Sequence, residues 1–96
     1  MNFLTLGIHY PRPEDLEKFV SATQSIADKA RTLDGLIDTG AWTDTETGCV
    51  VLVSLWASKE QADAARLVLG PMVKATPFGE WESRPPTQFF RLNRVV

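Results

Sequence analysis

The chain has 96 residues, 44% of them hydrophobic. A chain of this length has material for only one core, so we expect a single domain over residues 1–96. Ten basic residues against twelve acidic ones give a net charge of −2, which argues against a nucleic-acid partner. No segment reaches the roughly 20 apolar residues of a membrane span, and residues 1–10 lack the features of a leader peptide. We therefore expect a cytoplasmic protein with no membrane contact.

Residues 2–10 are predicted to form the first strand, because apolar residues alternate with others at the period of two that a strand requires. Leu4 and Leu6 fall on one face of this strand, and His9 falls on the other. A helix is predicted over residues 13–33. Proline followed by two acidic residues suits its first turn, and apolar residues then recur at three and four positions.

Two further strands form a predicted hairpin. Residues 36–43 mix β-branched residues with Gly40 after an Asp-Gly turn signal. Residues 49–56 form a run that is largely apolar on both faces. The polar residues 44–48, which end in glycine, have the composition of the connecting loop. Because both faces of the second of these strands are apolar, both of its sides must be covered.

A second helix is predicted over residues 59–69. Ser58 and Gln61 have the spacing of a capping box at its start, and a Gly-Pro pair follows its end. Residues 72–86 are long for a connection in so small a domain, and such segments usually carry function or an extra helical turn. Residues 87–96 are predicted to form the last strand.

The predicted order of elements is β-α-β-β-α-β, which is the split βαβ pattern of the ferredoxin-like fold. This α+β fold has a four-stranded antiparallel sheet with two helices on one face. The other face would stay bare, yet a central strand that is apolar on both sides is poorly stable half in water. We therefore expect two such sheets to pack face to face in a homodimer.

Three features of the sequence resemble the dimeric α/β-barrel superfamily and, within it, the antibiotic biosynthesis monooxygenase family. They are the "LDGLI" turn at residues 33–37, the "LVSLWASKEQADAA" passage at residues 52–65, which is similar to a Trp-x-Ser-x-Glu passage of that family, and the order of elements. The resemblance covers nearly the whole chain. It implies a dimeric α/β barrel with a pocket in each subunit between sheet and helices. In some members it also implies oxygenation of phenolic polycyclic substrates without metal or flavin.

Trp56 and His9 are the candidate catalytic residues. The resemblance matches Trp56 to a tryptophan that lies against the substrate in active members; its indole N–H could hold a developing oxyanion, or its ring could simply wedge the second helix against the sheet. The reaction also needs a base, and His9 is the only histidine. If the leucines of the first strand face the helices, His9 faces the partner subunit. Asp38 and Asp44 are alternative bases.

Phe78 and Trp81 belong to the segment that precedes the last strand. Two roles are open for them: an aromatic lid that contacts the substrate, or a hydrophobic plug over the core or the dimer seam. We retain both residues as candidate substrate-binding residues.

The sequence favours a protein without a cofactor. Haem-degrading members of the superfamily need a histidine on the second helix, and residues 59–78 contain none. One histidine and one cysteine, Cys49, cannot form a His or Cys metal cluster within a chain. Together with these features, the resemblance to the antibiotic biosynthesis monooxygenase family implies a cofactor-independent monooxygenase that acts on an aromatic or polyketide-like small molecule. The alternative is a non-catalytic dimeric α/β-barrel protein that binds a small ligand or acts as a stress-responsive scaffold.

Overall fold

A computed structural model describes residues 1–84 and 88–96. Its elements in chain order are β1 (Phe3–His9), η1 (Pro13–Asp15), α1 (Leu16–Ala30), β2 (Leu36–Thr43), β3 (Val50–Trp56), α2 (Lys59–Ala75), α3 (Phe78–Trp81) and β4 (Gln88–Asn93). Residues 85–87, which belong to the predicted connection and the start of the predicted last strand, lie outside the described residues. Apart from the short η1 and α3, this is the β-α-β-β-α-β order that the sequence predicts.

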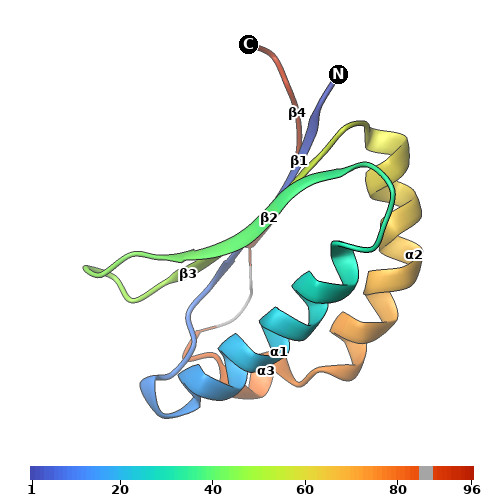
Figure 1. Ribbon diagram of the computed structural model, residues 1–96. Coiled ribbons are helices and arrows are strands. Elements are labelled where there is room, and N and C mark those ends of the chain that lie inside the picture. The colour runs from blue at the N-terminus through green and yellow to red at the C-terminus, as the bar shows by residue number, and fades with distance from the viewer. Residues whose placement is uncertain (85–87) are drawn as a thin grey trace.

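The four strands form one antiparallel sheet in the order β2-β3-β1-β4. The helices α1, α2 and α3 lie on the same side of this sheet (Figure 1). The predicted ferredoxin-like α+β fold is therefore confirmed, with β1 and β3 as its central strands. Among the described residues, no helix is long and apolar enough to cross a membrane.

Local sequence signals set the turns between these elements. Gly35 has a φ of 88° and Gly48 a φ of 75°, in the left-handed region that glycine adopts without steric cost. The hydroxyl of Ser58 accepts a hydrogen bond from the Gln61 amide at 3.2 Å, which caps α2 at its predicted start. These three signals fix where β2, β3 and α2 begin.

The predicted end of the second helix is wrong. Instead of stopping before Gly70 and Pro71, α2 continues to Ala75 with the proline inside it. The ring removes the N–H that would otherwise bond the carbonyl of Leu67, four residues earlier. Leu67 is 81% exposed, so the proline lies next to a solvent-facing part of the helix, where water can replace a lost backbone bond. The predicted connection over residues 72–86 is thus partly the last turn of α2 and partly α3.

The face of β1 that carries Phe3, Gly7 and His9 points towards the helices, and all three residues are buried. Phe3 packs against α2. Leu4 and Leu6 lie on the opposite face and are half-buried. The leucines therefore face away from the helices, so the arrangement in which His9 would face a partner subunit does not occur.

The sheet face opposite the helices is largely apolar, and no other described residue covers it. We call it the open face; its apolar side chains are Leu4, Leu6, Ile8, Trp42, Val51, Val53, Leu55, Phe90 and Leu92, and Asp38 and Gln88 lie at its margins. Those from β1 and β3 are half-buried, whereas those from β2 and β4 are exposed. The predicted apolar character of both faces of the third strand is thus present in the structure.

Buried residues form two clusters between the sheet and the helices. One cluster contains Phe3, Trp56, Ala62 and Ala65; the other contains Phe19, Val50 and Phe78. Phe3 pairs with Trp56 and His9 pairs with Val50, so the clusters lie at opposite ends of the ladder between β1 and β3. Six strand positions at about 3.4 Å each separate the two ends by roughly 20 Å.

Candidate functional site

The last residue of β1, His9, forms a buried pair with Glu82. His9 is 3% exposed, and its Nδ1 lies 2.7 Å from Oε1 of Glu82, which is also buried. The amide of Tyr10 donates to the same Oε1 at 3.3 Å. A histidine and a carboxylate therefore share a site from which water is largely absent.

The chain segment after α3 runs beside the end of β1 and brings Glu82 to His9. The amide of Arg12 donates to the carbonyl of Trp81 at 2.7 Å, and the amide of Ser83 donates to the carbonyl of Tyr10 at 2.8 Å. These backbone bonds lie on both sides of Glu82. The carboxylate is therefore placed by main-chain pairing as well as by its own contacts.

Three phenylalanine rings surround the imidazole. Phe19 of α1 and Phe89 of β4 meet it edge-on at centroid distances of 5.1 and 5.9 Å. Phe78 of α3 lies at 5.8 Å, and its ring contacts Trp81 at 5.9 Å. His9 thus sits in an aromatic layer that three different elements build.

Burial lowers the pKa of His9, and the neighbouring Glu82 only partly opposes this effect. The imidazole is consequently neutral near pH 7 and can accept a proton. Its second nitrogen, Nε2, is buried and has no hydrogen-bond partner within the described part of the chain. The hydroxyl of Thr23 on α1 is also buried without a hydrogen-bond partner among the described residues. A neutral base with one uncommitted nitrogen is the chemically distinctive feature of this region.

The structure brings together three of the four candidate site residues. His9, Phe78 and Trp81 belong to the aromatic layer. Trp56 is buried at the other end of the ladder, where it packs with Phe3 and the alanines of α2. A proton acceptor at His9 and an oxyanion donor at Trp56 therefore do not share one site within a chain.

The two alternative bases lie in water. Asp38 on β2 and Asp44 in the hairpin are both exposed. The Thr47 hydroxyl donates to Asp44 at 2.7 Å, and this bond together with nearby amides lowers the pKa of that carboxylate. The pKa of Asp44 is thus lowered from an ordinary value of 3.8 that is already far below neutrality, whereas His9 is a buried neutral imidazole with an ordinary value of 6.5, so His9 is the better candidate.

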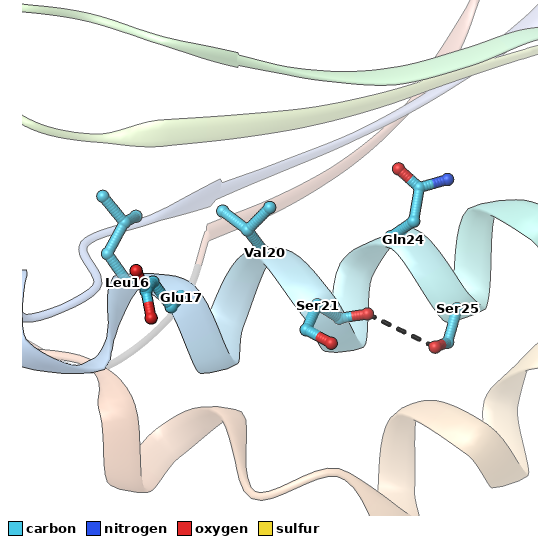
Figure 2. A pocket seen from close by; sticks show the side chains of 6 residues that line it. All are labelled: Leu16, Glu17, Val20, Ser21, Gln24 and Ser25. Carbon is cyan, nitrogen blue, oxygen red and sulfur yellow. Dashed lines mark hydrogen bonds between the residues drawn. The ribbon is translucent and has the colours of Figure 1, made fainter.

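Two surface hollows flank α1. The larger, of about 530 Å³, is lined by Leu16, Glu17, Val20, Ser21, Gln24 and Ser25. Figure 2 shows Leu16, Val20 and Gln24 pointing from α1 towards the side of the strands. The second, of about 390 Å³, lies between the end of α1 and the first turns of α2. Neither hollow is lined by His9 or Trp56.

Sequence reasoning did not identify Glu82, which lies 73 positions from His9 along the chain. No local pattern links residues that far apart. The available signal was indirect: the segment 72–86 was long for a connection and held an acidic residue next to Trp81. In the described ranges 1–84 and 88–96, no group of three or more His, Cys, Asp or Glu residues could hold a metal ion.

The fold is shared with several solved structures, although no family model and no curated protein matches the sequence. Rv0793 from Mycobacterium tuberculosis superposes with a TM-score of 0.83 at 17% identity, covering 100% of this chain and 97% of its own. A conserved protein from Methanosarcina mazei superposes with a TM-score of 0.85 at 13% identity, covering 99% of this chain and 94% of its own. A proposed antibiotic biosynthesis monooxygenase from Deinococcus radiodurans superposes with a TM-score of 0.81 at 11% identity, covering 98% of this chain and 93% of its own. The resemblance to the antibiotic biosynthesis monooxygenase family that the sequence indicated is thus confirmed at the level of the fold.

Proposed function

We propose that this protein is a cofactor-independent monooxygenase that acts on an aromatic or polyketide-like small molecule, with His9 as its general base. The observation that carries the proposal is the buried, neutral imidazole whose Nε2 is uncommitted inside an aromatic layer. The names of several solved structures with the same fold support it.

The chemistry needs a base and a dry site. For an anthrone, the base removes a proton from the methylene carbon or the corresponding enol, and the resulting anion gives one electron to O₂. Recombination with superoxide forms a C–O bond, and the protonated peroxide loses water as the carbonyl forms. One oxygen atom ends in the quinone, and the other leaves as water with the two methylene hydrogens. Exclusion of bulk water favours the electron-rich anion as reductant.

The aromatic side chains near His9 have two roles in this proposal. Trp81 is half-buried and meets the buried Phe78 edge-on, so Trp81 offers the surface on which a flat ring system can pack, and Phe78 supports it from the core. Trp56 contributes to folding rather than to the reacting centre, because it lies in the other buried cluster.

The proposal includes a homodimer in the manner of a dimeric α/β barrel. The open face carries apolar side chains from all four strands, and none of the residues in the described ranges 1–84 and 88–96 covers it. A second copy would supply a matching apolar face and remove this surface from water.

Oxygen consumption tests the function directly. Metal-depleted protein with anthrone should consume one O₂ for each anthraquinone formed. His9→Gln keeps a donor for Glu82 but removes the base, so turnover should fall by about 10²–10⁴-fold. The matched control is Leu67→Gln, which changes an exposed side chain of α2 and should leave turnover intact. Equal rates for wild type and His9→Gln would rule out His9 as the base.

One observation favours the alternative, a non-catalytic dimeric α/β-barrel protein that binds a ligand or acts as a scaffold. The interior beside Trp56 is filled by Phe3 and the side chains of α2, and the hollows lie elsewhere. Under this alternative, anthrone would be bound saturably without any O₂ uptake above the rate in buffer.

A further inference from the structure

The hydrogen bonds around Glu82 determine which nitrogen of His9 carries the proton. A backbone N–H can only donate, and the amide of Tyr10 points at Oε1 of Glu82, so this oxygen acts as an acceptor. The same oxygen lies 2.7 Å from Nδ1 of His9. With Glu82 ionised, Nδ1 is therefore the protonated nitrogen of the neutral ring, and Nε2 carries a lone pair.

This lone pair is buried without a donor in the described part of the chain. An unsatisfied buried acceptor is unfavourable, so a ligand that brings a donor to Nε2 recovers a hydrogen bond that the free protein lacks. A carboxylate ligand offers no donor, and its charge would be repelled by the Glu82 carboxylate behind the ring. The site therefore discriminates between a hydroxyl and an anion.

Phe89 lies beside His9 on the neighbouring strand, with a ring centroid distance of 5.9 Å. A Cβ atom on Gly7 would lie 3.2 Å from Nε2 and 3.1 Å from Cε1 of Phe89, so the absence of a side chain at Gly7 lets the two groups meet above the strand. Phe89 is 67% exposed, whereas the other two rings beside His9, Phe19 and Phe78, are buried. Phe89 is thus the ring that can rotate away without opening the core.

We propose that His9, Glu82 and Phe89 form a binding site for the hydroxyl group of a neutral aromatic ligand. Nε2 of His9 accepts the hydroxyl proton, Glu82 is the positioning residue that keeps the proton of the ring on Nδ1, and Phe89 is the movable cover. The inference rests on the proposed function for the aromatic class of the ligand, and it adds the group that is recognised and the residues that recognise it.

Because His9 is the only histidine, nitrogen NMR of histidine-labelled protein reports on this site alone. At pH 7.5 we expect a protonated Nδ1 and an unprotonated Nε2. The probe 1-naphthol should shift the Nε2 resonance saturably, and 1-naphthoate should bind about tenfold more weakly or worse. Phe89→Ala should retain the Nε2 response to 1-naphthol. A proton on Nε2, equal binding of the two probes, or an unmoved Nε2 in both wild type and Phe89→Ala would overturn the proposal.

The variant Glu82→Gln tests whether Glu82 acts on His9 through its charge or only fills space beside it. The amide oxygen can still accept from Nδ1 and from the Tyr10 amide, but the negative charge is gone. Phe19, Phe78 and Phe89 bring no charge to the ring, so Glu82 is the charged group in contact with it among the described residues. The pKa of His9 should fall further in Glu82→Gln and return towards the wild-type value in Glu82→Asp. A pKa of His9 that is the same in wild type and Glu82→Gln would remove Glu82 from the site.

These measurements distinguish the inference from the proposed function. The expected nitrogen resonances and naphthol response without O₂ consumption would leave the hydroxyl site intact and exclude the oxygenase. Anthrone turnover that depends on His9, together with a proton on Nε2, would support the oxygenase and exclude the hydroxyl site.

Discussion

His9 lies where three kinds of interaction act on one ring. Burial disfavours its protonated form, the Glu82 carboxylate favours that form, and burial has the larger effect on the pKa. A cationic imidazole would also place an N–H at Nε2 among phenylalanine rings, where no acceptor lies within the described residues. The neutral ring is therefore the state that the fold accommodates.

Stability should depend on pH through His9. Because its pKa in the folded protein is lower than the ordinary value of 6.5, the unfolded chain takes up the proton first as the pH falls. The contribution of His9 to the free energy of unfolding is fully present above pH 6.5 and is lost as the pH drops from there towards the pKa of the folded state. The loss is about 1.4 kcal/mol for each unit between the two pKa values. Urea unfolding at pH 7.5 and 5.5 measures this loss.

The variant His9→Gln provides the control for that measurement, since it removes the titrating group. The free energy of unfolding of this variant should change less between the two pH values than that of the wild type. A wild-type protein that becomes more stable on acidification over this range would contradict the assigned direction.

Trp56→Phe tests the second buried cluster. The substitution leaves a cavity beside Phe3 and α2, and we expect the free energy of unfolding to fall by about 1–2 kcal/mol. The Nε2 response of His9 to 1-naphthol should be unchanged, because the two clusters occupy opposite ends of the ladder. A loss of anthrone turnover on the order of 10²-fold, at a temperature where the variant is folded, would instead make Trp56 an oxyanion donor.

At the scale of elements, the turn before β2 is locked to the start of α2. Gly35 has a positive φ, its carbonyl accepts from the amide of Ala57 at 2.7 Å, and the side chain of Gln61 lies directly over it. The turn therefore depends on glycine both for backbone conformation and for space.

Gly35→Ala and Gly48→Ala form a matched pair that separates these two requirements. Both glycines have a positive φ, so each alanine should cost about 1–2 kcal/mol from the backbone alone. At Gly48 nothing lies within 4 Å of the new Cβ, whereas at Gly35 it would lie 2.3 Å from Cδ of Gln61. Chemical denaturation should thus show the larger loss for Gly35→Ala, and equal losses would mean that Gln61 moves aside freely.

At the scale of the whole molecule, the open face sets the expected assembly. Light scattering at micromolar concentration should give about twice the chain mass of 10.7 kDa. Val53→Lys places a charge in the middle of the open face and should shift the protein towards the monomer, because burying an unpaired charge is unfavourable. The same change at the exposed Leu67 should leave the mass unaltered. A wild-type monomer under these conditions would contradict the homodimer.

The sequence alone determined the elements and their order. Alternation in residues 2–10, the capping residue Ser58 and the glycine turns act within a few residues of one another, so they can be read from one chain. The boundaries of β2 agree with those predicted at Leu36 and Thr43. The first helix and the last strand are shorter than predicted, with α1 at Leu16–Ala30 and β4 at Gln88–Asn93. The largest difference is at Pro71, because whether a helix tolerates proline depends on what surrounds the carbonyl that loses its partner.

The tertiary structure decided the site. A period of two tells which residues share a face of β1, but it does not tell which face meets the helices; the packing of the whole chain sets that, and it placed His9 inside with the leucines outside. The pairing of His9 with Glu82 spans 73 positions, and a contact at that distance leaves no periodic trace in the sequence. The sequence therefore named His9 as the candidate base, while only the folded chain decided its partner, its aromatic surroundings and its separation from Trp56.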